Sequence, residues 1–208
     1  MRPRPRLSLS LLLTCLPMWA CESTASELEL SGGITIELPN YAHRRTSFDG
    51  STCVDVGKKD FFFVVCFSGR RLSESATDNG FKKYSDVSSE DMGRVQPLPS
   101  EAYVFVTGGS YGWLYPTKHR RLGEFDVYEV DNVLCRDDSP GLGQPAICYT
   151  AALSSHVIRN LPLSIYVDAI IEKHPGPVNE ISAMAKFHIE SIRTFIKKLK
   201  IHTGNVEW

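Results

Sequence analysis

Two pairs of cysteines with the same spacing constrain the fold of this chain more than any other feature. Cys53 and Cys66 are thirteen residues apart, and so are Cys135 and Cys148. The first pair lies in two apolar, β-rich runs that flank a turn-forming segment at residues 57–60. If residues 59 and 60 form a two-residue loop, Cys53 stands opposite Cys66. Their Cβ atoms would then be about 4.5–5.5 Å apart, which is close to the range of a disulfide.

The second cysteine pair brackets a segment rich in glycine and proline. Two prolines and two glycines lie between Cys135 and Cys148, so the chain must turn or loop there. The centre of this segment falls between Gly141 and Leu142, which again allows the two cysteines to stand directly opposite each other. A second disulfide-closed hairpin is therefore expected.

Structural disulfides and a zinc site are the two competing interpretations of these cysteines. Four cysteines permit three connectivities, and the shared spacing favours Cys53–Cys66 and Cys135–Cys148. In the chain-entropy account, a bridge that closes a loop of this size contributes about 3 kcal/mol to the free energy of unfolding. Thirteen-residue gaps are not the spacing of zinc ligands, and the chain has no Cys-x-x-Cys motif. We expect two disulfides, no metal and no cofactor.

The first 25 residues have the composition of an export signal. Three arginines precede an apolar run over residues 7–16, which is too short to span a bilayer. Cleavage after Ala25 leaves only the four paired cysteines. Attachment of a lipid anchor to Cys21, as in bacterial lipoproteins, also leaves four. Both alternatives stay open, and both predict a single domain over residues 26–208, located in the periplasm or at the outer membrane.

The charge of this domain bears on its partners. Residues 26–208 carry 20 basic and 23 acidic groups, a net charge of −3. No basic excess is present to neutralise a nucleic-acid backbone, which argues against DNA or RNA as the main partner. The mild acidity permits a basic partner.

Strand patterns come first along the domain and one helical pattern closes it. Runs of β-branched and aromatic residues, several of them alternating with polar residues, are typical of strands. They predict strands over residues 34–38, 52–56, 61–67, 102–107, 113–115, 124–130, 147–153 and 163–172. A Pro-Gly-Pro break at residues 175–177 precedes a helix that we expect from about residue 178 to residue 201.

The expected helix is amphipathic. Its apolar residues recur at three- and four-residue spacing on one face, namely Ile181, Met184, Ala185, His188, Ile192, Phe195, Ile196 and Leu199. We interpret this stripe as the face of the helix that packs on the sheet. We interpret His188 as a hydrogen-bonded core histidine, not a ligand. The sequence thus predicts an α+β fold with a mainly antiparallel sheet, hairpin-local disulfides and one long C-terminal helix packed on the sheet.

Between residues 68 and 100 the regular patterns lapse. The segment is polar, with thin apolar spacing at Phe81, Tyr84 and Val87. We expect a long loop with at most one short helix. Loops of this length are uncommon inside a compact domain and are often functional, which makes this segment a candidate binding surface.

Catalytic motifs are nearly absent. Residues 108–112 match G-x-S-x-G around Ser110 after a predicted strand. A nucleophile elbow needs a helix next, whereas the residues from Trp113 onward read as another strand. No histidine spacing typical of a metal site and no phosphate-binding loop occurs. We expect no enzyme. A small periplasmic hydrolase that uses Ser110 or a pair of carboxylates is kept as an alternative.

An exported, disulfide-stapled domain without a catalytic set resembles the small immunity proteins of the bacterial envelope. These proteins neutralise toxins delivered between bacteria, including type VI secretion effectors. The resemblance concerns signal, size, disulfides and fold type. It implies a protein partner, a cognate toxin or effector, bound through a loop or a strand edge. The candidate contact residues lie on the loop between the second pair of cysteines: Asp137, Asp138, Ser139, Leu142 and Gln144.

A structural or cell-wall-binding envelope lipoprotein is the remaining alternative. An exposed aromatic groove at Trp113 and Tyr115 would favour this ligand-binding interpretation over toxin inhibition.

Overall fold

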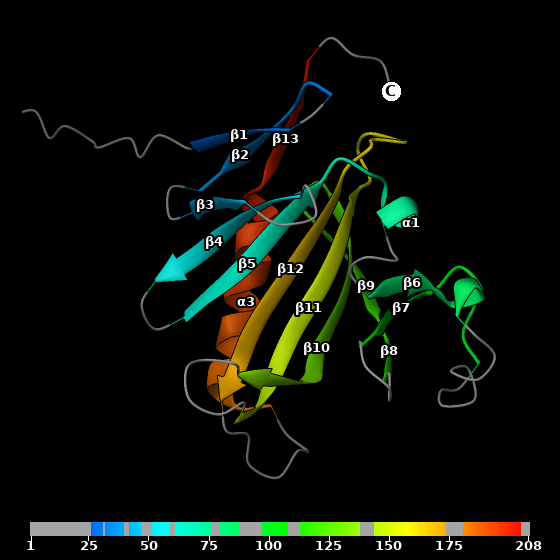
Figure 1. Cartoon of the computed structure of the whole chain (residues 1–208), viewed down its shortest axis with the longest axis vertical. Coiled ribbons are helices and arrows are strands. Elements are labelled where there is room, and N and C mark those ends of the chain that lie inside the picture. The colour runs from blue at the N-terminus through cyan, green and yellow to red at the C-terminus, as the bar shows by residue number, and fades with distance from the viewer. Residues whose placement is uncertain are drawn as a thin grey trace, which may run out of the picture.

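The protein is described here by a computed structural model, in which one long helix packs on a broad antiparallel sheet with two smaller sheets beside it (Figure 1). The structure describes residues 26–30, 32–39, 42–46, 51–58, 61–75, 80–87, 97–107, 113–137, 144–173 and 181–204. The predicted α+β class, with its mainly antiparallel sheet and packed C-terminal helix, is confirmed.

Seven strands form the main sheet, in the order β3-β4-β5-β12-β11-β10-β9, and each neighbouring pair is antiparallel. Their bounds are β3 (Ala42–Thr46), β4 (Thr52–Lys58), β5 (Phe61–Ser68), β9 (Lys118–Leu122), β10 (Phe125–Asp137), β11 (Gln144–Ser155) and β12 (Ser164–Lys173). The sequence patterns predicted the five inner strands. They missed β3 and β9, the two edge strands, because basic residues dominate both, as is common at sheet edges.

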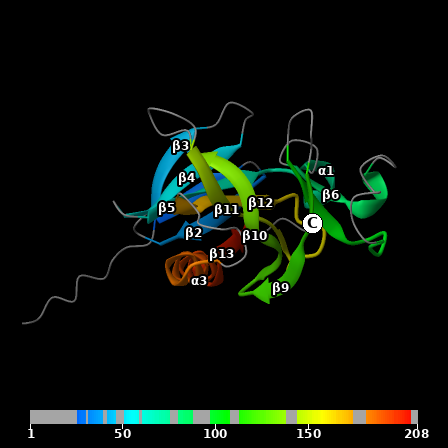
Figure 2. The ribbon, with the colours of Figure 1, turned by 90° about the horizontal axis from the view of Figure 1, so that it is seen from below.

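The helix α3 (Ala183–Lys198) lies against one side of the main sheet (Figure 2). Alternate residues of each inner strand point toward it, so that Val65 and Val167 are fully buried beside Ile192 of the helix. Burial of apolar side chains stabilises such a contact by roughly 25 cal/mol per Å² removed from water. The main core therefore lies between the sheet and this single helix.

Two three-stranded sheets complete the fold. One is β1 (Ser26–Leu30), β2 (Ile34–Leu38) and β13 (Lys200–Thr203), and its apolar residues join the main core. The other is β6 (Phe81–Lys83), β7 (Tyr103–Val106) and β8 (Leu114–Pro116). With the short helix α1 (Leu72–Ser75), this second sheet covers part of the face opposite α3, where Leu72 and Phe81 pack against Tyr166.

Both predicted disulfides are present. Cys53 pairs with Cys66 directly across β4 and β5, with 4.0 Å between Cα atoms, as the two-residue loop predicts. Cys135 bonds to Cys148 as predicted, but the two residues do not take the directly opposed position that the spacing allowed. The ladder of β10 and β11 pairs Cys135 with Ala146, so the bridge runs diagonally and its Cα atoms are 5.9 Å apart. Beyond the register shift between Val130 and Val133, the ladder pairs Cys148 with Val133, two residues before Cys135, and this register sets the offset.

The predicted bounds of the helix are wrong at both ends. The helix begins at Ala183, because the Ser182 hydroxyl accepts a hydrogen bond from the amide of Ala185 and caps it. It ends at Lys198, where Leu199 turns to an extended conformation and the chain continues as β13 along β2. Pairing with β2 therefore overrides the helical pattern of the last residues. The predicted stripe is also partly wrong, since Met184 is largely exposed.

The interval between residues 68 and 100 is not the long loop that its polarity predicts. Helix α1, strand β6 and the 3-10 turn η1 (Tyr84–Asp86) all lie within it. Phe81 and Val87 are buried and Tyr84 packs beside Val87, so the thin apolar spacing marked the residues that attach this segment to the fold.

Candidate functional site

The main sheet forks between β5 and β12. The register of these strands runs from Ser164–Ser68 to Asp168–Val64 and ends there. Beyond this point, residues 61–63 of β5 continue to pair with β4, and residues 169–173 of β12 continue along β11. Figure 1 shows the two strands separating toward the lower end of the sheet, with α3 behind them.

Two local features accompany the fork. The ladder of β11 and β12 pairs Ile170 with Cys148 but Glu172 with Ile147, so Ile171 is an extra residue that bulges β12. On the other side, Gly57 in β4 has φ +132°, and a Cβ there would lie 2.3 Å from the carbonyl oxygen of Phe61. Only glycine fits this close approach. Bulges and such kinks twist and bend strands, and both features lie next to the point where β5 and β12 part.

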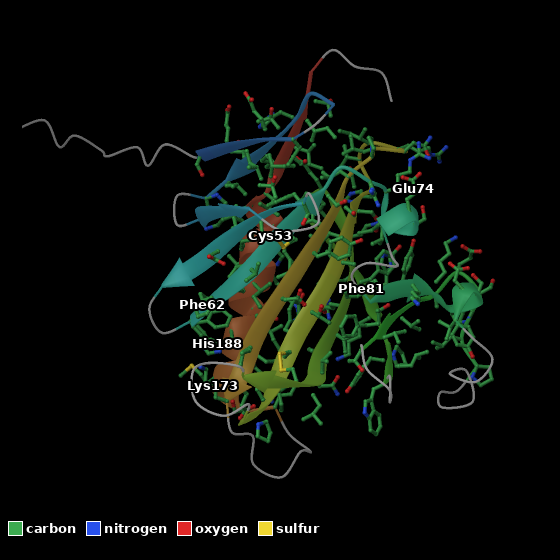
Figure 3. The ribbon with its side chains drawn as sticks, in the orientation of Figure 1. Cys53, Phe62, Glu74, Phe81, Lys173 and His188 are labelled. Carbon is green, nitrogen blue, oxygen red and sulfur yellow. A yellow bond between two sulfur atoms is a disulfide. The ribbon has the colours of Figure 1, made fainter. Side chains whose placement is uncertain are left out.

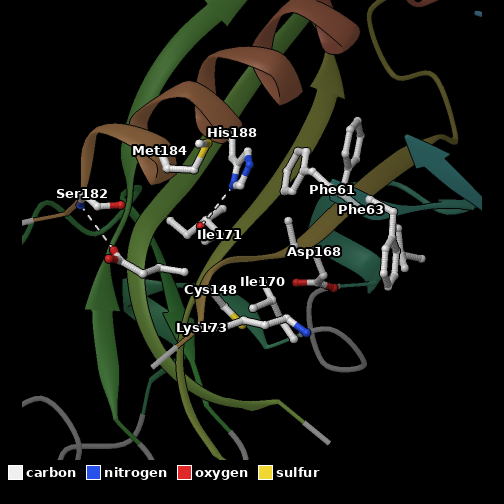
Figure 4. Close-up of a pocket in the computed structure, with 14 residues that line it drawn as sticks. Phe61, Phe63, Cys148, Asp168, Ile170, Ile171, Lys173, Ser182, Met184 and His188 are labelled. Atoms are coloured by element: carbon white, nitrogen blue, oxygen red, sulfur yellow. Dashed lines mark hydrogen bonds between the residues drawn. The ribbon is translucent and has the colours of Figure 1, made fainter. Parts of the chain in front are cut away.

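The fork holds a cleft of about 600 Å³, a volume typical of binding sites for small ligands (Figure 4). Its walls come from β5, β11, β12 and α3, and most of them are apolar. The lining residues are Phe61, Phe62, Phe63, Val64, Cys148, Asp168, Ala169, Ile170, Ile171, Glu172, Lys173, Ser182, Met184 and His188. Phe62 and Met184 are 63% and 62% exposed, so two large apolar side chains meet solvent at this cleft. Exposed apolar groups at a concave site are typical of binding surfaces.

Asp168 lies where the fork begins, opposite Val64. Its neighbours Val167 and Ala169 are buried in the core, so Asp168 points to the opposite face of the sheet and reaches solvent inside the cleft. Removal of surrounding water by the protein raises the pKa of Asp168, and a hydrogen bond from the Thr150 hydroxyl, 2.7 Å long, opposes this shift only in part. Among the described residues Asp168 has no ion pair.

His188 closes the cleft on the helix side. Its ring stacks on Phe61 of β5, with centroids 3.9 Å apart and planes 2° from parallel. Its Nδ1 lies 3.1 Å from the carbonyl oxygen of Ile171, the bulged residue of β12. A carbonyl oxygen only accepts, so Nδ1 carries the proton. His188 therefore bridges both arms of the fork, and its side chain satisfies a carbonyl that the bulge removes from the ladder.

A second cluster of charges is centred on a carboxylate that is fully buried in the main core. Glu129 of β10 is fully buried, and it accepts hydrogen bonds from Tyr149 at 2.7 Å and from Arg193 of α3 at 2.6 and 3.2 Å. Arg120 Nε lies 2.5 Å from the same carboxylate as an ion pair, although its N–H does not meet hydrogen-bond geometry. Arg193 also pairs with Glu190.

This cluster joins the helix to the sheet. Burial lowers the pKa of Arg193, but its hydrogen bonds to Glu129 and Glu190 outweigh that effect and raise it. Burial and the Glu129 carboxylate raise the pKa of Tyr149 far above its ordinary value. The arrangement is structural, because Glu129 and Tyr149 are sealed from any substrate.

The structure places only part of the predicted contact surface. Asp137 and Gln144 pair with each other at the ends of β10 and β11, beyond the second disulfide. Asp138, Ser139 and Leu142 lie outside the described residues, as does the lipidation candidate Cys21. Cys148 lines the cleft, so the hairpin that carries the predicted loop borders the site. Sequence patterns missed the cleft itself.

The G-x-S-x-G motif and the aromatic alternative can also be placed. Ser110 lies outside the described residues, between β7 and β8, which pair as a hairpin from Val106–Leu114 onward. A strand, not the helix of a nucleophile elbow, therefore follows the motif. Trp113 is 65% exposed and Tyr115 is half-buried, and the described cleft lies elsewhere.

Two further surveys concern metal and membrane binding. Within the described ranges, no group of three histidine, cysteine or acidic side chains is placed to hold a metal ion. No helix in the part of the chain that the structure covers combines the length and the hydropathy that a bilayer crossing needs. The two disulfides are typical of a protein that folds in an oxidising compartment.

No model of a known protein family matches this chain, and no curated protein sequence matches it significantly.

Proposed function

We propose that the chain is an exported binding protein whose partner occupies the cleft between β5 and β12. One observation carries this proposal: a preformed, largely apolar cleft with exposed Phe62 and Met184 and a solvent-reached carboxylate, Asp168, whose ionised form is disfavoured. A pocket that combines apolar walls with a few polar groups and a shifted pKa is the default binding site of a structure.

Within this class, we propose an immunity protein of the bacterial envelope, which neutralises a toxin or secreted effector by direct binding. The support is the layout of the chain: an export signal, a single disulfide-stapled domain and no recognised catalytic motif. The periplasm or the outer membrane is the proposed location. Both proposed cleavage positions precede β1, so either one leaves every described strand intact.

Capture of the partner by two matched variants tests the proposal. The full chain, produced with its own N-terminal segment and kept oxidised, is immobilised and exposed to lysate of the source organism, and retained proteins are identified by mass spectrometry. F62A removes an exposed aromatic ring at the cleft. W113A removes a ring that is about equally exposed, 65% against 63%, on β8's side of the molecule. Neither change disturbs the core.

We expect one toxin-like enzyme, retained in stoichiometric amount after a salt wash and inhibited by the chain. Loss of a central aromatic anchor costs about 2 kcal/mol or more, so F62A should weaken retention by roughly thirtyfold and W113A should not change it. Retention of cell-wall fragments, or of no partner, would overturn the immunity assignment. A partner lost in W113A but kept by F62A would move the site to β8.

A further inference from the structure

The two open arms of the fork suggest how a partner is held. Among the described residues, 61–63 of β5 and 169–172 of β12 each have one strand neighbour, β4 and β11 respectively, and they face each other across the cleft. A strand with a free side presents backbone N–H and C=O groups that pair readily with another extended chain. His188 already hydrogen-bonds one such group, the carbonyl of Ile171.

The charges of the cleft suggest the side chain that the partner supplies. Its charged lining residues are Asp168, Glu172 and Lys173. Glu172 accepts a hydrogen bond from the amide of Ser182 at the start of α3, while the bond that Asp168 accepts comes from a neutral hydroxyl. Both carboxylates thus accept from a neutral group, and Asp168 is the one that stands where β5 and β12 part, so the partner's cation is assigned to it. The net charge of −3 over residues 26–208 favours the same sign of partner.

The walls around Asp168 suit the long stem of a basic side chain. Val64 stands opposite Asp168, and Phe62, Phe63 and Ile170 line the same cleft. Lysine and arginine bury their methylene stems on apolar surface while the charged head stays hydrogen-bonded, and a cation gains further from a neighbouring aromatic face.

We propose that the cleft binds an extended peptide segment that adds a strand to the open arms of β5 and β12 and places a lysine or arginine on Asp168. This inference rests on the proposed function and names the recognition chemistry of the same site. It assigns the partner contact to a linear segment of the partner, so that short peptides should reproduce it.

Selection from a random peptide library tests this inference without the natural partner. A display library of linear octapeptides is selected on the oxidised full chain, and the enriched sequence is synthesised with blocked ends. We expect enriched peptides to share one lysine or arginine among β-forming residues. The synthetic peptide should bind D168N about tenfold more weakly than the unchanged chain, since a charge-assisted contact is lost.

Two controls make the result specific. D131N removes the same charge on β10, where Asp131 pairs with Lys118 and does not line the cleft, and should leave peptide binding unchanged. Replacement of the peptide's cation by norleucine should weaken binding to the unchanged chain and make no further difference in D168N. This pattern shows that the two groups act on each other.

The outcomes separate this inference from the proposed function. Enriched peptides without a cation, binding that is indifferent to D168N, or no enriched peptide would each overturn the inference. If the natural partner still depends on Phe62 in any of these cases, the cleft binds a folded surface and the proposed function stands. If F62A also leaves binding of the natural partner unchanged, both the inference and the proposed function are wrong.

Discussion

At the scale of single residues, folding shifts the pKa values of Asp168 and Asp126 in opposite directions. Although the Asp168 side chain meets solvent in the cleft, the protein around it removes part of its hydration and raises its pKa, and the Thr150 hydroxyl offsets only part of the shift. Asp126 is also partly buried, which raises its pKa, but hydrogen bonds from Arg121 and His119 outweigh this and lower it. Ionised Asp168 therefore destabilises the folded state, whereas ionised Asp126 stabilises it.

The same substitution at both positions should change stability with opposite sign. D168N should raise the free energy of unfolding at pH 7, because Asn still accepts from Thr150 and carries no charge. This gain should vanish as the pH falls below about 4, where the unfolded chain also protonates its aspartates. D126N should lower stability at pH 7 by about 1 kcal/mol, and that loss should shrink as the pH falls through the lowered pKa of Asp126. Urea unfolding at a series of pH values measures both. A loss of stability for D168N at pH 7 would contradict this account of Asp168.

The sequence could predict residues whose partners are local. Cys53 and Cys66 face each other because a two-residue loop sets their register, and local spacing contains that information. The hydrogen bond of His188 was predicted correctly, but its predicted place in the core is wrong, since it is half-buried and lines the cleft. The environment of Asp168 could not be predicted. Strand alternation shows that Asp168 lies on the polar face of its strand, but it does not show which residues of other elements surround it. The cleft around it requires β5 and α3, which are distant in sequence.

At the scale of elements, the Glu129 cluster is the polar contact that fastens α3 to the sheet. The buried Glu129 carboxylate contacts two guanidinium groups and a tyrosine hydroxyl. Removal of one charged partner therefore leaves a buried charge that no opposite charge balances. We expect E129Q to lower the free energy of unfolding by about 3 kcal/mol or more.

Two comparison variants test that expectation. E190Q removes the exposed partner of Arg193 and should cost less than about 1 kcal/mol. In urea unfolding, the double variant E129M/R193M should lose clearly less than the sum of its single variants, since it leaves fewer unpaired buried charges. Additive single effects would contradict a coupled cluster.

Strands and helices could be predicted where the spacing of their apolar residues is regular. Phe61–Ser68 and Ser164–Lys173 lie close to the predicted strands, because each carries a long run of β-branched and aromatic residues. Lys118–Leu122 was missed, because an edge strand can be almost wholly charged when a neighbouring strand supplies its hydrogen bonds and counterions. The end of the helix at Lys198 was missed for a similar reason, since β13 forms by pairing with distant β2.

At the scale of the whole molecule, the cleft results from the way the sheet closes around one helix. The paired part of β5 and β12 continues the core, while in the forked part Phe61 and His188 stack against each other. Figure 3 labels His188 at this end of the sheet. Phe62, His188 and Lys173 gather at this end, away from Phe81 and the sheet that carries it. The sequence could predict the layers of the fold. It could not predict the fork, because Gly57 and the Ile171 bulge act only through the strands beside them.

Hydrogen exchange of backbone amides, measured with and without the captured partner, tests the central claim most directly. If the partner occupies the cleft, amides in residues 61–63 of β5 and 169–171 of β12 should exchange more slowly in the complex, while those of β8 and of the strand ends beyond Cys135 and Cys148 should not change. Protection confined to β8, or to residues 135–137 and 144–147, with the fork unchanged, would contradict the claim and place the binding surface on the aromatic edge or on the disulfide-closed hairpin.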